Sequence, residues 1–345
     1  MKIDGRNIGI DCSPYIIAEM SANHNGSIEK AFKIIEMAKE RGADAVKLQS
    51  YTPDTITIKS NRPEFMIDHG LWKGKTLYDL YASAFMPWEW HKPLFDKAKE
   101  VGITIFSSPF DFSAVDMLEE LGAPAYKIAS FEAIDLPLIE YVAKTGKPMI
   151  ISTGMANEDE IREAVECALG AGCKELAILH CVSGYPAPSS DYNLRTIADM
   201  REKFNCEVGL SDHTLDNTSA LVSVAMGATI IEKHVTLDRN GGGADDSFSL
   251  EPADLEELCV GAKIAWESMG SINYTMKSSE KENVKFRRSL YVIKDIKKGE
   301  EFTSNNVRSI RPGYGAAPKF LKNIIGKIAK SDIDSGTPFS IDKFI

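Results

Sequence analysis

The stretch IEKAFKIIEMAKERGADAVKLQS, residues 28–50, contains one complete unit of the pattern that decides the fold. Gly42 separates a segment of helical period from a short apolar run over residues 45–50, which reads as a buried strand. The helical segment, residues 28–41, carries its apolar side chains on one stripe: Ala31, Ile34, Ile35 and Ala38. The unit is therefore helix, glycine, strand.

The same alternation extends in both directions and fills residues 1–270. Eight parallel strands separated by helices close most economically into a (β/α)8 TIM barrel, and no G-x-G-x-x-G fingerprint favours a doubly wound sheet. A long insertion, Asp54–Met86, follows the second strand and predicts a lid or an interface element. The eight predicted strands are Tyr15–Met20, Ala45–Ser50, Thr104–Ser107, Ala125–Ile128, Met149–Ser152, Leu176–His180, Val208–Ser211 and Ile230–His234.

The composition predicts a second, smaller module after the barrel. Residues 271–345 contain 15 Lys and Arg against 8 Asp and Glu, although the whole chain of 345 residues has a net charge of −10. Residues 271–288 are mostly polar and predict a linker, and residues 289–345 predict a compact β-rich domain with glycine turns. The domains expected are thus a barrel over 1–270, a linker over 271–288 and a small domain over 289–345.

Several classes of function are disfavoured by the same numbers. A chain that is 43% hydrophobic and 26% charged is globular, and no apolar run reaches the roughly 18–20 residues that span a bilayer. We therefore expect a cytoplasmic protein without a membrane partner. The cations of the basic tail alternate with apolar residues rather than forming a patch, so nucleic acid is not expected as a partner.

Polar side chains end nearly every predicted strand, where TIM barrels hold their reacting groups. One lysine or serine at such a place is more often structural, but agreement among seven strands favours a site. Two cations, Lys47 and Lys127, together with four serines predict a cradle for phosphate and carboxylate oxygens. The serines are Ser108, Ser130, Ser152 and Ser211.

His213 and His234 end adjacent predicted strands and form a candidate open site for one divalent ion, with water or substrate as the remaining ligands. Glu19 ends the first strand, where it can act as a general base or pair with Lys47. Glu132 and Asp245 lie on loops, where they can accept hydrogen bonds from a sugar or face solvent. The other histidines are not expected to be ligands: His24, His69, His91 and His180.

At these residues the chain resembles the sialic acid synthase family, which makes nonulosonic acids. The resemblance extends almost from end to end, and the tail resembles the antifreeze-like (SAF) domain of that family. Barrel motifs include IAEMSANHNG (17–26), GADAVKLQ (42–49), FSSPF (106–110), YKIASFE (126–132), ISTGMA (151–156), LHCVSGYPAP (179–188), GLSDHT (209–214), IEKHVTLDR (231–239) and FSLEP (248–252). The tail motifs are RRSLY (287–291), DIKKGE (295–300) and RPGYG (311–315).

The resemblance implies a role for each candidate residue. Phosphoenolpyruvate would bind to the two lysines and four serines of the cradle, a divalent ion (Mn²⁺, alternatively Mg²⁺ or Co²⁺) to His213 and His234, and Glu19 would be the catalytic base. It also implies a homodimer in which the C-terminal domain is swapped, so that Arg311 reaches into the partner's site. The sugar contacts it implies are Glu132, Tyr185, Asp245 and Arg311.

Finer features place the chain nearest the pseudaminic acid branch of the family. Ala129–Glu132 reads ASFE where neuraminate synthases usually have GSGE, and Asp246 stands where they usually have histidine. This branch implies a transferase that condenses phosphoenolpyruvate with 2,4-diacetamido-2,4,6-trideoxy-L-altrose. The alternatives are a neuraminate or legionaminate synthase, and a non-catalytic carbohydrate-binding protein. The carbohydrate-binding protein is disfavoured, because a protein that only binds a sugar does not need a base, an anion cradle and a histidine pair together.

Overall fold

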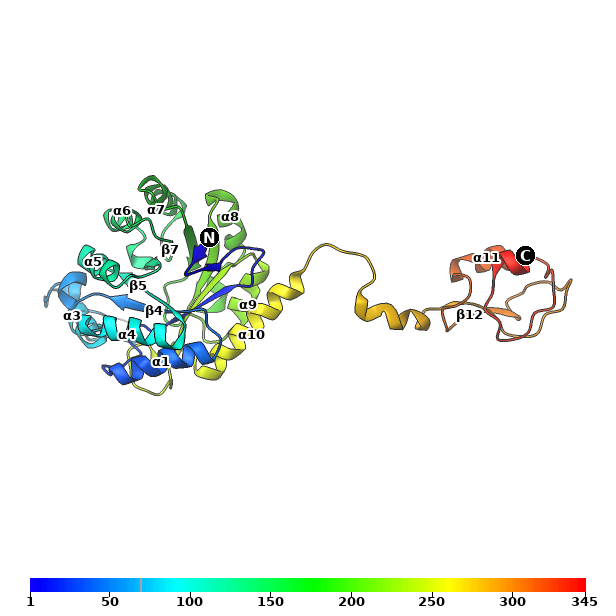
Figure 1. Ribbon diagram of the computed structural model, residues 1–345, viewed down its shortest axis with the longest axis horizontal. Helices are drawn as coiled ribbons and strands as arrows, with labels where there is room; N and C mark the ends of the chain where they lie inside the picture. The colour runs from blue at the N-terminus through cyan, green and yellow to red at the C-terminus, as the bar shows by residue number, and fades with distance from the viewer. Residues whose placement is uncertain (69) are drawn as a thin grey trace. The chain divides into compact units, whose positions relative to one another are not determined.

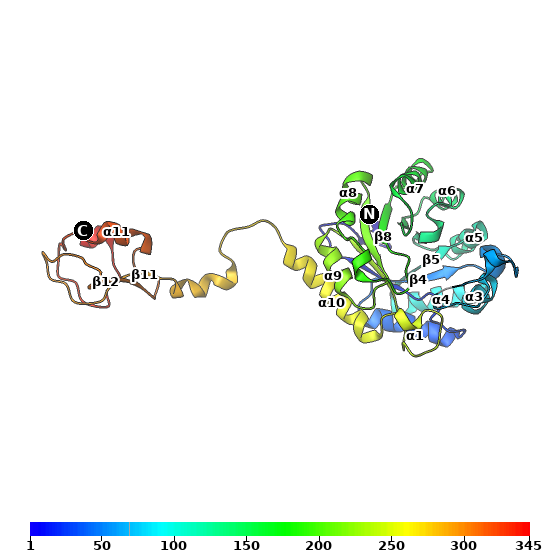
Figure 2. The ribbon, with the colours of Figure 1, turned by 180° about the vertical axis from the view of Figure 1, so that it is seen from behind.

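A computed structural model describes residues 1–68 and 70–345, which form two compact units, Met1–Gly270 and Ser271–Ile345. In the first unit, eight parallel strands close into a barrel in the order β10-β3-β4-β5-β6-β7-β8-β9. The helices form a ring outside these strands in both views of the unit (Figure 1 and Figure 2). The predicted TIM barrel is therefore confirmed.

Three of the observed strands have the predicted limits, four differ by one or two residues at one end, and β9 is one residue longer at each end. The differences are small because each strand lies within a buried apolar run. The strands are β3 (Tyr15–Glu19), β4 (Ala45–Ser50), β5 (Thr104–Pro109), β6 (Tyr126–Ile128), β7 (Met149–Ser152), β8 (Leu176–Cys181), β9 (Glu207–Asp212) and β10 (Ile230–His234).

The outer helices bury one apolar stripe each against the strands. In the helix after Ser27, the stripe Ala31, Ile34, Ile35 and Ala38 is fully buried, and the Ser27 hydroxyl accepts the Lys30 N–H at 3.2 Å as an N-cap. None of the described helices is long and apolar enough to cross a membrane. The helices are α1 (Ile28–Glu40), α4 (Trp88–Val101), α5 (Phe112–Glu120), α6 (Leu136–Ala143), α7 (Glu158–Gly170), α8 (Thr196–Phe204), α9 (Thr218–Ala225) and α10 (Pro252–Met269).

The barrel interior is apolar at the amino end of the strands and polar at the carboxyl end. Since strand side chains alternate between faces, the inward residues of β10 are Ile230, Glu232 and His234. Ile230 packs in an apolar cluster with Ile17 and Phe106. A short hairpin, β1 (Lys2–Ile3) with β2 (Arg6–Asn7), adds Ile3 to this cluster. The polar groups at the carboxyl end thus rest on a packed floor.

The insertion after β4 folds into ordered structure at the carboxyl end of the barrel. It contains α2 (Pro53–Ile56), the 3-10 turn η1 (Pro63–Phe65), a bridge between Met66 and Thr76, and α3 (Leu77–Ala84). The Thr76 hydroxyl accepts the Asp79 N–H at 3.0 Å and caps α3. The insertion therefore presents a built surface to the carboxyl end of the strands.

The second unit has its own apolar core around Leu290, Val292, Phe302 and Phe339. Its one sheet pairs β11 (Ser289–Val292) with β12 (Val307–Ile310) in antiparallel fashion, and isolated bridges and turns supply most of the remaining order. Short helical segments are η5 (Ser278–Phe286), η6 (Pro318–Phe320), α11 (Leu321–Ile324) and α12 (Ile341–Phe344). Residues 271–288, the predicted linker, are exposed throughout.

Candidate active site

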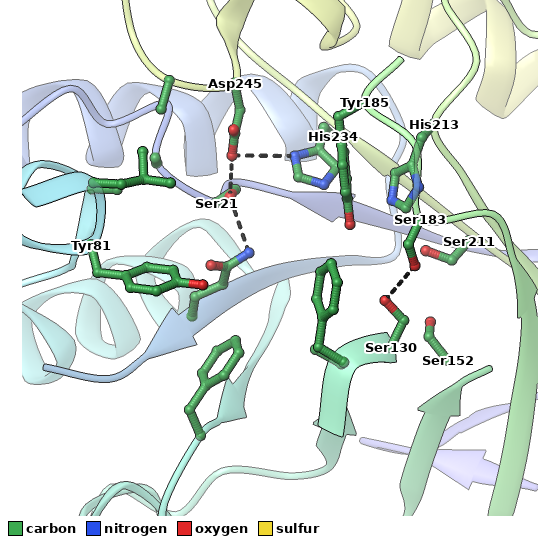
Figure 3. A pocket seen from close by; sticks show the side chains of 18 of the residues that line it. Ser21, Tyr81, Ser130, Ser152, Ser183, Tyr185, Ser211, His213, His234 and Asp245 are labelled. Atoms are coloured by element: carbon green, nitrogen blue, oxygen red, sulfur yellow. Dashed lines mark hydrogen bonds and ion pairs between the residues drawn. The ribbon is translucent and has the colours of Figure 1, made fainter. Parts of the chain in front are cut away.

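A cavity of about 680 Å³ opens at the carboxyl ends of the barrel strands. Glu19 and Ser108 are buried directly behind it, both in contact with Lys47, and Arg311 is an exposed residue of the second unit. Figure 3 shows several of the lining side chains pointing toward the same space. The predicted site residues that line the cavity are Lys47, Lys127, Ser130, Glu132, Ser152, Tyr185, Ser211, His213, His234 and Asp245.

Two lysines and two carboxylates meet at the floor of this cavity. Lys47 Nζ lies 3.0 Å from Glu19 Oε2 and 3.2 Å from Glu232 Oε1, while Lys127 Nζ lies 3.4 Å from the same Glu232 oxygen. All four side chains are at most 5% exposed. Buried charges persist only when they are paired or used, and here each cation has an anionic partner that an incoming anion could replace.

Burial and pairing shift the pKa values of these groups in different directions. Burial raises the pKa of Glu19, and the negative charge of Glu232 adds to this, against the opposing effect of Lys47. Burial lowers the pKa of Lys127, and the nearby charge of Lys47 lowers it further. Lys47 is buried as well, but Glu19 and Glu232 together outweigh the burial and raise its pKa. A carboxyl group with a raised pKa is suited to accept a proton near neutral pH.

Serine hydroxyls surround the lysines. Ser108 Oγ accepts a hydrogen bond from Lys47 Nζ at 3.2 Å, Ser211 Oγ donates to Glu232 at 3.4 Å, and Ser130 and Ser183 share one at 2.8 Å. The Ser152 hydroxyl is buried without a hydrogen-bond partner in the part of the chain that the structure describes. A buried donor without a partner suits a ligand that brings acceptor oxygens.

Gly154 lets these serines approach one another. Its φ is +51°, and a Cβ atom there would lie 2.5 Å from Ser130 Cβ and 2.7 Å from Ser183 Oγ. Both the backbone conformation and the lack of space require glycine. The close approach of the two serines therefore depends on this position.

The two candidate metal ligands lie side by side, with ring centroids 5.5 Å apart. His213 Nδ1 is 2.8 Å from the Val182 carbonyl oxygen, so this bond involves Nδ1 and not Nε2. His234 Nδ1 is buried without a hydrogen-bond partner among the described residues. Burial, and then the charge of His213, lowers the pKa of His234, which favours the neutral imidazole that binds metals. No group of three or more His, Cys, Asp and Glu side chains within residues 1–68 and 70–345 is arranged to hold an ion. The pair therefore fits an open site in which water or substrate completes the shell.

A chain of hydrogen bonds links the sugar-binding candidate Asp245 to Glu19. Ser21 Oγ donates to Asp245 Oδ2 at 2.5 Å (Figure 3). Gln49 Nε2 lies 3.0 Å from Ser21 Oγ and 2.9 Å from Glu19 Oε1. Asp245 Oδ2 is also 3.8 Å from His234 Nδ1. Asp245 is buried, so its loop position does not expose it to solvent.

The remaining histidines lie in packing positions. His24 packs edge-on against Trp90, His91 is bonded to Ser50 Oγ at 2.7 Å, and His180 is bonded to the Tyr192 carbonyl. None of these three lines the cavity. His69 lies outside the described residues.

The structure adds site residues that the sequence analysis left unassigned. Glu232 bonds with both lysines, and Ser21 and Gln49 connect Glu19 to Asp245. Strand alternation places two of them in the site from sequence, without giving their roles, because Gln49 is two residues after Lys47 and Glu232 is two before His234, on the same inward face. Ser21 carried no such signal because it lies beyond β3 in a left-handed conformation, φ +45°.

The fold and the site together define a TIM-barrel enzyme. A family model described as the NeuB family matches residues 34–274, and one described as the SAF domain matches residues 287–345. The chain belongs to the NeuB family.

Relatives and a solved structure agree with this membership. The chain is 43% identical over 330 residues to the pseudaminic acid synthase of Campylobacter jejuni serotype O:23/36, covering 96% of each chain. It is 39% identical to the N,N′-diacetyllegionaminic acid synthase of C. jejuni serotype O:2, covering 91% of this chain and 95% of that one. The solved N-acetylneuraminic acid synthetase of Leptospira borgpetersenii superposes with a TM-score of 0.74 at 30% identity, covering 83% of this chain and 95% of that one.

Proposed function

We propose that this chain is a pseudaminic acid synthase, a transferase that condenses phosphoenolpyruvate with 2,4-diacetamido-2,4,6-trideoxy-L-altrose and releases phosphate. One observation carries the proposal. A chain 43% identical to a pseudaminic acid synthase across 96% of both lengths has one cavity lined by two lysines, three of the four cradle serines and two histidines, with the fourth serine, Ser108, directly behind its wall. This combination suits a trianionic substrate and a carbonyl acceptor together.

Phosphoenolpyruvate would bind at the floor of the cavity. Its carboxylate and phosphate oxygens would take over the ammonium groups of Lys47 and Lys127 from Glu19 and Glu232, which pair with them at 3.0–3.4 Å. Serine hydroxyls would supply neutral donors, beginning with the unpartnered Ser152. Glu19 would then be left as a buried carboxylate beside the bound substrate, held by Gln49.

These positions support the following reaction. Carbon 3 of phosphoenolpyruvate attacks the sugar aldehyde carbon and forms the new C–C bond, while the C=O π bond breaks and the aldehyde oxygen takes up a proton to become a hydroxyl. Cationic character is left at carbon 2. Water adds to carbon 2, and Glu19 takes the proton that this water loses. The tetrahedral intermediate then breaks its bond between carbon 2 and the phosphate oxygen, giving phosphate and the nonulosonic acid.

His213 and His234 would hold a divalent ion, Mn²⁺ or alternatively Mg²⁺ or Co²⁺, near the acceptor end of the cavity. When bound, such an ion supplies Lewis-acid polarisation of a carbonyl oxygen. The chain's own part is to orient the imidazoles: the Val182 carbonyl fixes the His213 ring, and Tyr185 packs 4.4 Å from His213 and 6.0 Å from His234 between ring centroids.

The sugar would contact Glu132, Tyr185 and Asp245, with Arg311 supplied by the C-terminal domain of a partner subunit in a swapped homodimer. Arg311 is exposed, and the turn after it is fixed because Ser289 Oγ donates to the Pro312 carbonyl at 2.7 Å. An exposed guanidinium on a fixed turn can offer a forked pair of donors to sugar oxygens.

The test is phosphate release from phosphoenolpyruvate across a panel of amino sugars, with mass spectrometry of the products. The panel includes the altrose derivative, its manno-configured isomer that leads to legionaminate, and N-acetylmannosamine. We expect the highest kcat/KM with the altrose derivative. A higher value with either other sugar would make the chain a legionaminate or neuraminate synthase, and sugar binding without phosphate release would support a carbohydrate-binding protein.

A further inference from the structure

The cavity has two chemically different walls. One wall comes from the barrel strands and their loops and carries the lysines, carboxylates and histidines. The other comes from the insertion over residues 53–86 and is apolar. Its main contributors are Ile56, Ile67, Leu71, Trp72, Leu77 and Leu80, which we call the insertion wall.

The insertion wall offers few polar atoms to a ligand. Among its described cavity-lining side chains, only Trp72 and the neighbouring Tyr81 carry any. The Trp72 indole N–H already donates to the Ala244 carbonyl at 3.2 Å. A ligand hydroxyl placed against this wall would lose its water without gaining equal hydrogen bonds, whereas a methyl group would gain by leaving water.

Aromatic contacts hold the helical part of the insertion wall in place. Tyr81 packs edge-on against Tyr51 at 5.6 Å between centroids, and Tyr51 packs in the same way against Phe110 at 5.3 Å. Leu80 is buried at 7% exposure on the same helix, α3. These contacts tie α3, which carries Leu77 and Leu80, to the residues that follow β4 and β5, so this part of the wall is preformed rather than assembled around each ligand.

A buried acceptor adjoins the insertion wall. Glu132 Oε2 is buried without a hydrogen-bond partner among the described residues, and its carboxyl group lies close enough to Tyr81 to raise the pKa of that phenol after the effect of burial. The N–H of an acetamido substituent is a suitable donor for this oxygen. The methyl of that substituent would then lie toward apolar neighbours. Donor and methyl are both present in an acetamido substituent.

We propose that the insertion wall determines acceptor specificity by selecting sugars with a methyl group at carbon 6 and acetamido substituents over sugars with hydroxyls at those positions. This inference rests on the proposed function, because it concerns the second substrate of that reaction. The selection is assigned to one segment of the chain, the insertion after β4.

A matched pair of sugars isolates the selection: 2,4-diacetamido-2,4,6-trideoxy-L-altrose and the same sugar with a hydroxyl at carbon 6. Titration calorimetry measures binding of each, and phosphate release measures kcat/KM. We expect the 6-deoxy sugar to be favoured by about 10- to 100-fold, the range that apolar pockets achieve against an added hydroxyl. A ratio near one for the unmodified protein would overturn the proposal.

Two substitutions then locate the effect. Leu77→Gln and Leu71→Gln each place an amide on the insertion wall, and Leu71 is 54% exposed, so its replacement leaves the core intact. Each should reduce the preference by roughly 3- to 10-fold, mainly by improving the 6-hydroxy sugar. The matched control is Ile58→Gln, in the same insertion but 61% exposed and outside the cavity lining. Leu77→Met should retain the preference.

The readouts separate this inference from the proposed function. If the 6-deoxy preference appears in binding and falls in both wall variants, the inference holds even where no phosphate is released, and the proposed function alone fails. If phosphate is released but the preference is unchanged in both wall variants, the function holds and the inference is wrong. An equal loss of preference in Ile58→Gln would also contradict it, because that side chain does not line the cavity.

Discussion

Glu19 has two possible roles, and one substitution separates them. Its carboxylate pairs with Lys47 at 3.0 Å and accepts from Gln49 at 2.9 Å, while burial raises its pKa. Glu19→Gln preserves the shape and removes the base, so we expect phosphoenolpyruvate to bind but turnover to fall by about 10²- to 10⁴-fold. Stopped assays and calorimetry measure the two effects. Glu256→Gln, which removes only an exposed pair with Arg41, is the control, and an unchanged rate in Glu19→Gln would leave it as a salt-bridge partner.

Metal dependence is expected from His213 and His234, whose rings are adjacent, because burial lowers the pKa of His234 and favours the neutral imidazole that binds metals. Chelation should abolish phosphate release, and Mn²⁺, Co²⁺ or Mg²⁺ should restore it. The double variant His213→Ala/His234→Ala should lose both activity and binding of Mn²⁺ measured by calorimetry. Full turnover by the chelated double variant would rule out a catalytic ion at this pair.

Glu132 should make sugar binding depend on pH. Burial raises the pKa of its carboxyl group to about 7, so the group is mostly protonated at pH 6 and mostly ionised at pH 8. The ionised form accepts an amide N–H more strongly, so the KM for the sugar should fall as the pH rises through this range. Glu132→Gln should bind the sugar more weakly and lose this difference between pH 6 and 8. An identical pH profile in the variant would exclude Glu132 as the titrating contact.

Inference from single residues succeeded where strand alternation fixes the direction of a side chain. Lys47 lies within β4 and His234 ends β10, both on the inward face, so their position in the cavity could be predicted without coordinates. The position of the apolar insertion wall could not be predicted, because its residues are far from the strand ends and the direction of their side chains depends on how α3 and the segment before it pack. The burial of Asp245 likewise depends on Ser21, which is 224 positions away.

At the scale of elements, a buried ion pair holds together the ends of β9 and β10, which carry the two histidines. Lys233 pairs with Asp212 on the outward face at 2.8 Å and donates to the carbonyls of Thr214 and Asp216 at 2.9 and 2.7 Å. The two residues are in register across the strands. The histidines beside them, His213 and His234, therefore converge because their neighbours are linked.

Lys233→Met should accordingly destabilise the protein by about 3–5 kcal/mol, the cost of leaving a buried charge unpaired. It should also weaken Mn²⁺ binding, because the loop after β9 loses three hydrogen bonds. Urea unfolding and calorimetry measure these effects. Asp212→Asn/Lys233→Met removes both charges and keeps the acceptor for the Thr214 N–H, so it should recover part of the stability. No loss of stability in the single variant would contradict this role.

For the whole molecule, the order and number of strands could be predicted because each βα unit is specified locally by an apolar run and a helical stripe. The small domain was harder to predict, because only eight of its residues form regular strands and turns make up much of the rest. The proposed contribution of that domain to a partner's site would depend on contacts between chains, and single-chain periodicity carries no signal for these.

The swapped arrangement makes a prediction that only an assembly of two chains can fulfil. If Arg311 completes the partner's cavity, a dimer of one Arg311→Ala chain and one Glu19→Gln chain has both lesions in one site and neither in the other. Each variant alone should be nearly inactive, whereas an equal mixture allowed to exchange subunits should regain about a quarter of the unmodified activity, because half of randomly paired dimers contain one intact site in two. The same mixture with Arg308→Ala in place of Arg311→Ala provides the control: Arg308 is an exposed arginine on β12, so that chain should be active alone. If heterodimers form and the Arg311→Ala mixture stays inactive, Arg311 acts within its own chain or has no part in the site.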